Sequence, residues 1–113
     1  MNNMDLRVLI IEDSADDAEL VITQIKKINY AIYYEIIDTP KQMKEALYNN
    51  DWDIILADYS MPNFSGSEAL DILNESGLDI PFILVSGKID EETAVEVMKK
   101  GAVDYISKNN LSR

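Results

Sequence analysis

Residues 54–58 read Ile-Ile-Leu-Ala-Asp, four apolar residues that lead into a carboxylate, and similar patterns recur along the chain. The other apolar runs and the polar residues that follow them are 8–11 with Glu12 and Asp13, 82–85 with Ser86, and 103–107 with Lys108. Short apolar runs between helical patterns are typical of parallel strands buried on both faces. Because such sheets bind ligands at the carboxyl ends of their strands, we expect these polar residues to meet at one edge.

The segments between the runs have apolar residues every three or four positions, which predicts amphipathic helices. The predicted N-terminal caps are Ser14, Thr39, the segment 65–68 and Asp90. Pro40 suits the first helical position, Gln42 is placed to complete a capping box, and Gly101 is expected to end the last helix. The residues predicted to face inward are Ala18, Val21, Ile22, Ile25 and Ile28; Met43, Ala46 and Leu47; Ala69, Leu70 and Leu73; and Ala94, Val97 and Met98.

A further strand is predicted at 32–37, which gives five strands alternating with four helices. Short connections and right-handed crossovers then specify an α/β fold with an open, doubly wound parallel sheet. The 113 residues fit one domain, 1–113, with no linker or repeat.

The amino-acid composition argues against several classes of function. The formal net charge of −11 argues against direct nucleic-acid binding, which depends on Lys and Arg. No apolar stretch approaches the roughly 18 residues that a membrane span needs. The chain has no cysteine, so disulfides and thiolate metal sites are excluded, and residues 1–5 do not resemble a secretion signal. We therefore expect a cytoplasmic protein that does not bind a membrane.

The polar residues expected at the sheet edge are carboxylates, a hydroxyl and an ammonium group. Carboxylate oxygens are ligands that Mg²⁺ prefers, and a lysine ammonium is a common partner of phosphate. This combination suggests a magnesium ion and a phosphoryl group.

These residues resemble the receiver domain of two-component response regulators over essentially the whole chain. The resemblance is carried by the pair Glu12-Asp13, the segment 58–62 with Gly66, the pair Ser86-Gly87, and Tyr105 three residues before Lys108. Five elements in this order are jointly specific, although each alone is common. The resemblance implies a flavodoxin-like sheet with strand order 2-1-3-4-5.

The resemblance also implies a role for each site residue. Asp58 would be the phosphoryl acceptor, and Lys108 and Ser86 would contact the phosphoryl group. Asp13, Asp58 and the backbone carbonyl of Ser60 would bind Mg²⁺, with Glu12 acting through water and Mn²⁺ as a possible substitute. Tyr105 would move together with Ser86 and transmit the change to the face of the fourth helix and fifth strand.

The chain contains no histidine, so the phosphoryl donor must be another protein. The resemblance implies a histidine kinase or a histidine phosphotransfer protein as donor, and an output domain or protein as target. Homodimers could form through the face of the fourth helix and fifth strand, or through an uncovered face of the sheet.

Two departures from the family pattern stand out. Asn109 follows Lys108 where many members have proline, so we expect a trans peptide and a somewhat different loop. Only five residues follow Lys108, although the family normally adds a fifth helix that covers one face of the sheet beside the first helix. We therefore expect that helix to be missing or truncated, and the chain to be the N-terminal part of a longer protein or a truncated one.

Simpler interpretations exist for each position. Asp58 could be a solvated residue at a strand end. The negative charges of Glu12 and Asp13 could stabilise the N-terminus of the first helix, as those of Asp16 and Asp17 do. Lys108 could be a solvated surface residue, and Ser86 and Tyr105 could be ordinary strand residues.

Three functions compete with that of a phosphoryl-accepting receiver. A receiver-like interaction module that does not depend on phosphorylation is the main alternative, and the intact site residues disfavour it. A flavodoxin-like electron carrier would need a phosphate-binding loop where the acidic segment 12–17 stands. Hydrolases with an aspartate nucleophile generally have a second aspartate two positions later, where this chain has Ser60.

Overall fold

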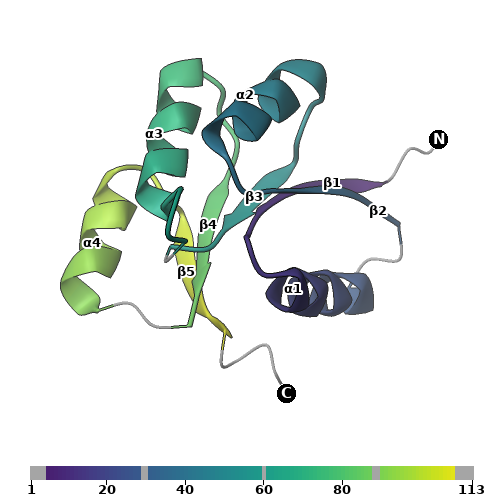
Figure 1. The fold of residues 1–113 in the computed structure, drawn as a ribbon, viewed down its shortest axis with the longest axis horizontal. Helices are drawn as coiled ribbons and strands as arrows, with labels where there is room; N and C mark the ends of the chain where they lie inside the picture. The colour runs from purple at the N-terminus through teal and green to yellow at the C-terminus, as the bar shows by residue number, and fades with distance from the viewer. Residues whose placement is uncertain (1–4, 29–30, 60, 88–89, 109–113) are drawn as a thin grey trace.

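Five strands and four helices alternate along residues 5–28, 31–59, 61–87 and 90–108, the residues that this computed structural model describes (Figure 1). In chain order they are β1 (Leu6–Ile11), α1 (Ala15–Ile28), β2 (Ile32–Ile37), α2 (Pro40–Asn49), β3 (Ile54–Ala57), α3 (Gly66–Ser76), β4 (Phe82–Ser86), α4 (Glu91–Lys99) and β5 (Asp104–Ser107). The strands form one parallel sheet in the order β2-β1-β3-β4-β5. This confirms the predicted fold class and strand order.

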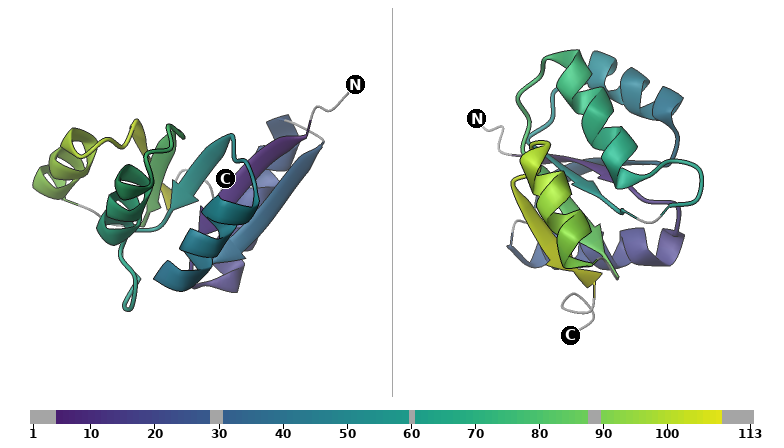
Figure 2. Two further views of the ribbon diagram at one scale, coloured as in Figure 1. Left: turned by 90° about the horizontal axis from the view of Figure 1, so that it is seen from above. Right: turned by 90° about the vertical axis from the view of Figure 1, so that its left-hand side faces the viewer.

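The sheet is the middle of three layers, with α1 on one face and α2, α3 and α4 on the other (Figures 1 and 2). Within β1, Val8 and Ile10 pack on the α1 side, while Leu9 and Ile11 pack on the side of α2 and α3. All four side chains are buried. The central strands are continuously apolar because both of their faces are covered, as the sequence pattern predicted.

The predicted helix caps are present, with one correction. The Ser65 and Glu68 side chains each accept a hydrogen bond from the other residue's backbone N–H, which completes a capping box, and Asp90 caps α4. Thr39 accepts from the Gln42 N–H as predicted. The Gln42 side chain, however, accepts from the N–H of Asp38 and not from that of Thr39.

Two residues predicted to face inward are exposed. Ile28 is 89% exposed at the end of α1. Met98 is 40% exposed, and Val97 is the one buried residue of α4. Ile28 instead lines an apolar groove of about 160 Å³ between α1 and the sheet. The other groove residues are Val21, Gln24, Ile25, Leu56, Val85 and Ile106.

The groove lies on the face that was expected to lack a fifth helix. Among the described residues no helix follows β5, and Asn109, where the family often has proline, lies outside them. None of the helices in the described part of the chain is long and apolar enough to span a bilayer.

The start of α3 packs directly against the segment that carries Asp58. The Gly66 N–H donates to the carbonyl of Tyr59 at 3.3 Å. A Cβ atom at Gly66 would lie 2.9 Å from Cδ1 of Leu84 and 3.0 Å from the carbonyl oxygen of Asp58. Since these distances are too short for a methyl group, glycine allows helix and loop to meet here.

We predict that Gly66→Ala lowers the free energy of unfolding by about 1–3 kcal/mol, because the added methyl forces the loop and α3 apart. Urea unfolding followed by circular dichroism measures this change. Gly87→Ala is the matched control: a methyl there would meet no atom of the described residues within 4 Å. Its expected effect is within about 0.5 kcal/mol. Equal effects of the two substitutions would contradict the close-packing interpretation.

Candidate functional site

The carboxyl ends of β1 and β3 place two acidic residues beside each other. The N–H of Asp58 donates to the carbonyl of Ile11 at 2.9 Å, and the N–H of Glu12 donates to that of Ile37 at 2.9 Å. These backbone bonds extend the sheet pairing one residue beyond the strands. The main chains of Glu12 and Asp58 are therefore fixed by the sheet itself.

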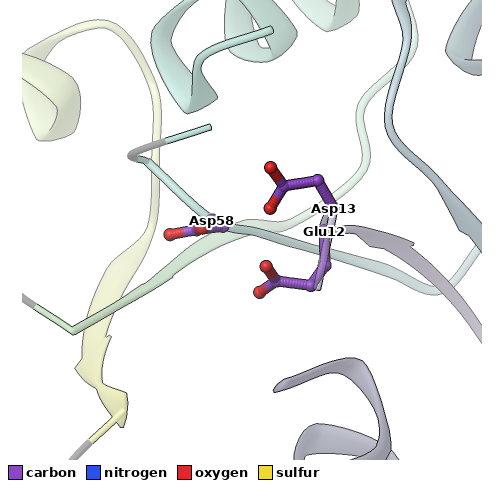
Figure 3. Close-up of side chains that lie close together, drawn as sticks. All are labelled: Glu12, Asp13 and Asp58. Carbon is purple, nitrogen blue, oxygen red and sulfur yellow. The ribbon is translucent and has the colours of Figure 1, made fainter. Parts of the chain in front are cut away.

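Three carboxylates gather at this edge, as the sequence predicted. Glu12, Asp13 and Asp58 each offer an oxygen, and these oxygens lie within 4.8 Å of one another. Figure 3 shows Glu12 and Asp13 extending from the end of β1, with Asp58 beside them. Glu12 and Asp58 are only 5% and 7% exposed, whereas Asp13 is exposed. The cluster thus has a buried base and a side open to solvent.

Lys108 joins this cluster from the residue after β5. Its Nζ atom lies 3.0 Å from Oε1 of Glu12, 3.4 Å from Oδ2 of Asp58, and 2.7 Å from Oδ2 of Asp17 in the first turn of α1. One ammonium group therefore serves three carboxylates. The simpler interpretation of Lys108 as a solvated surface lysine is wrong, since its side chain is only 15% exposed.

Burial and neighbouring charges shift the protonation of these groups. Burial is the main reason why the pKa of Glu12 is raised from 4.5 to about 7, and the charge of Asp58 adds to the increase, while the hydrogen bond from Lys108 opposes it. For Lys108, burial alone would lower the pKa. Its hydrogen bonds to Asp17 and Glu12, with the charges of Glu12 and Asp58, outweigh burial and raise the pKa, so Lys108 stays protonated.

Ser86 and Tyr105 occupy β4 and β5, which follow β3 in the sheet. Ser86 is completely buried at the end of β4, and it pairs with Ser107, the residue before Lys108. This register brings Ser86 to the edge where Lys108 begins. Tyr105 is half-buried and packs on the sheet face covered by α2, α3 and α4.

The sequence predictions missed one contact and included one residue that the structure does not describe. Asp17 was taken only as a favourable charge at a helix N-terminus, yet it makes the shortest contact with Lys108. Its place in the first turn after the Glu12-Asp13 loop was the available signal. Ser60, whose backbone carbonyl was predicted to bind the metal, lies outside the described residues.

The raised pKa of Glu12 predicts a pH-dependent stability. A folded-state pKa of about 7 against 4.5 means that the folded chain holds this proton more tightly than the unfolded chain. The resulting stabilisation is complete below pH 4.5 and is lost as the pH rises towards 7. In EDTA, we expect the unfolding free energy of the wild type to decrease between about pH 5 and 7.5. In Glu12→Gln this decrease should be smaller by about 1–3 kcal/mol.

Urea unfolding at the two pH values measures this difference. Glu45→Gln, which removes an exposed carboxylate from α2, is the control and should keep the wild-type pH dependence. A wild-type decrease that survives in Glu12→Gln would show that other groups cause it.

Comparison with known proteins identifies the family. The family model for the response regulator receiver domain matches residues 8–112. The cell cycle response regulator CtrA of Brucella abortus is 33% identical over 103 residues, and CtrA of Caulobacter vibrioides is 29% identical over 103 residues. Each match covers 91% of this chain and 44% of the relative, so the chain spans less than half the length of these curated relatives.

Solved structures show the same fold. The Francisella response regulator 1452 receiver domain has a TM-score of 0.78 and 26% identity, covering 95% of this chain and 90% of that one. The structure titled FixJ-N has a TM-score of 0.74 and 29% identity, covering 94% of this chain and 83% of that one. Together with the family match over most of its length, these likenesses show that the chain belongs to the response regulator receiver domains of two-component signalling.

Proposed function

We propose that this domain accepts a phosphoryl group on Asp58 with the help of Mg²⁺ and thereby switches a protein–protein interaction surface. One observation carries the proposal. The buried Asp58 carboxylate lies beside Glu12 and Asp13 and 3.4 Å from the Lys108 ammonium. The site therefore brings together what the reaction needs. Asp58 can act as the nucleophile, Glu12 and Asp13 can help to bind a metal ion, and Lys108 offers a positive charge for the phosphoryl oxygens.

Phosphoryl transfer depends mainly on positioning and charge stabilisation. In the proposed reaction an Asp58 carboxylate oxygen forms a bond to phosphorus, while the bond from phosphorus to the donor's histidine nitrogen breaks and the imidazole keeps the electron pair. The product is an acyl phosphate on Asp58. Lys108 would stabilise charge on the phosphoryl oxygens, and the Ser86 hydroxyl would donate a hydrogen bond to one of them.

Receiver domains typically bind Mg²⁺ at an acidic pocket, and the cluster of Glu12, Asp13 and Asp58 fits such an ion. The fit rests on donor chemistry, since carboxylate oxygens suit Mg²⁺. We propose Asp13, Asp58 and the Ser60 carbonyl as direct ligands and Glu12 as a ligand through water, with Mn²⁺ as a substitute. A bound ion would supply positive charge that screens the carboxylates from an incoming phosphoryl group.

The partners follow from the family and the chemistry. We propose a histidine kinase or histidine phosphotransfer protein as donor, because the chain has no histidine, and an output domain or protein as target. Ser86 and Tyr105 would carry the change to the face of α4 and β5. Homodimerisation, through that face or the uncovered sheet face, remains a prediction, as does a cytoplasmic location.

We predict that acetyl phosphate adds one phosphoryl group to the wild-type chain in the presence of Mg²⁺. Intact mass spectrometry of fresh samples measures the adduct. Asp58→Asn should show none, because the amide lacks a nucleophilic carboxylate, and wild type in EDTA should show little. Asp38→Asn, which alters an exposed aspartate between β2 and α2, should behave as wild type. No adduct on the wild-type chain would favour an interaction module that does not depend on phosphorylation.

We predict that Asp13→Asn weakens Mg²⁺ binding at least about tenfold, because it removes the solvent-facing carboxylate of the cluster. Isothermal titration calorimetry measures the affinity, and Mn²⁺ should bind the same site. Asp16→Asn removes an equal charge from the exposed start of α1, outside the cluster, and should have a much smaller effect. If both variants lose the same affinity for Mg²⁺, the loss comes from the change in net charge and not from coordination of the ion by Asp13.

A further inference from the structure

The contact between Asp17 and Lys108 ties the first turn of α1 to the end of β5. The two residues are 91 positions apart, and their hydrogen bond of 2.7 Å is the shortest that Lys108 makes within the described residues. Asp17 is also anchored locally, since its N–H donates to the Ser14 hydroxyl at 3.3 Å. The main chain of Asp17 is therefore fixed at the start of α1, and its carboxylate reaches the Lys108 ammonium from there.

The Lys108 ammonium lies closer to Asp17 than to Asp58. A lysine ammonium has three hydrogens to donate. In this structure its two shorter contacts are with Asp17 and Glu12, at 2.7 and 3.0 Å, whereas Asp58 lies at 3.4 Å. A phosphoryl group on Asp58 would add oxygens and negative charge beside the ammonium. The Asp17 side chain is 40% exposed, against 4% for Glu12, so water can replace Lys108 most easily at Asp17.

We propose that Asp17 is a positioning residue that holds Lys108 at α1 in the unphosphorylated domain and releases it when Asp58 carries a phosphoryl group. The inference rests on the proposed phosphorylation of Asp58. Asp17 does not touch the reacting atoms, and it acts only by competing for the ammonium group. Its effect on the reaction is therefore a restraint, which its removal should relieve.

The simpler interpretation is that Asp17 only favours the N-terminus of α1, as acidic residues do in first helical turns. Asp16 provides the comparison, because it occupies the same turn and is exposed to solvent, and Lys108 makes no ion pair with it in the described structure. Both residues contribute the same charge to the helix terminus. Of these two residues, only Asp17 contacts Lys108 in the described structure.

The test compares the rate constants for phosphorylation by acetyl phosphate with Mg²⁺ in wild type, Asp17→Asn, Asp16→Asn and Asp17→Glu. In the reaction an Asp58 oxygen binds phosphorus, and acetate leaves with the electron pair of the broken bond. A small donor avoids effects on kinase docking. We expect Asp17→Asn to react roughly three- to tenfold faster than wild type, the scale of one half-exposed charged contact. Asp16→Asn and Asp17→Glu should stay within about twofold.

The Asp17→Glu variant distinguishes a positioning role from a general structural effect of substitution, because it keeps a carboxylate that can pair with Lys108. Circular dichroism confirms that each variant is folded. Equal rates in Asp17→Asn and Asp16→Asn, or a slower reaction in Asp17→Asn, would overturn the inference while leaving phosphorylation of Asp58 established. If wild type takes up no phosphoryl group, the proposed function fails, and the inference fails with it.

Discussion

A single ammonium group shared by three carboxylates is the interaction on which this site depends. Glu12 and Asp58 are buried together at the sheet edge, an arrangement that is unfavourable unless positive charge compensates it. Within the described residues Lys108 is the side chain that supplies it, and the raised pKa of Glu12 indicates that the compensation is incomplete. Further positive charge would therefore be favourable here, which is the electrostatic basis for the magnesium site that we propose.

The scaffold holds these charges in place against their repulsion. Backbone hydrogen bonds continue the sheet to Glu12 and Asp58, so neither residue can move away without breaking strand pairing. The close approach of Gly66 closes the other side of the Asp58 segment. Since the sheet is buried on both faces in its centre, the main chains of Glu12 and Asp58 are attached to a closely packed core.

The strands were predictable because a short, continuous apolar run bounded by polar residues suits a strand that is covered on both faces. β2 begins and ends at the predicted residues, β1 contains the whole apolar run 8–11, and the charged residues after the strands meet as expected. The burial predictions were wrong where the apolar pattern of a helix continues beyond the surface against which the helix packs. Ile28 and Met98 fit the periodicity of their helices, but periodicity does not reveal where the neighbouring surface ends. Contacts between residues far apart in sequence, such as the Asp17–Lys108 pair, depend on the exact direction of two side chains, and only the three-dimensional arrangement reveals them.

Lightly held elements lie next to Lys108. β5 is an edge strand that pairs only with β4, and α4 buries a single side chain, Val97. Tyr105, three residues before Lys108, packs on the same sheet face as α4. A change in the position of Lys108 would thus act on a strand held from one side and a lightly packed helix, where rearrangement breaks few contacts. The better-packed side of the sheet, around β1 and β3, would keep the carboxylates in place meanwhile. This division between a fixed charge cluster and a loosely held edge is the physical reason to expect the proposed switch at α4 and β5.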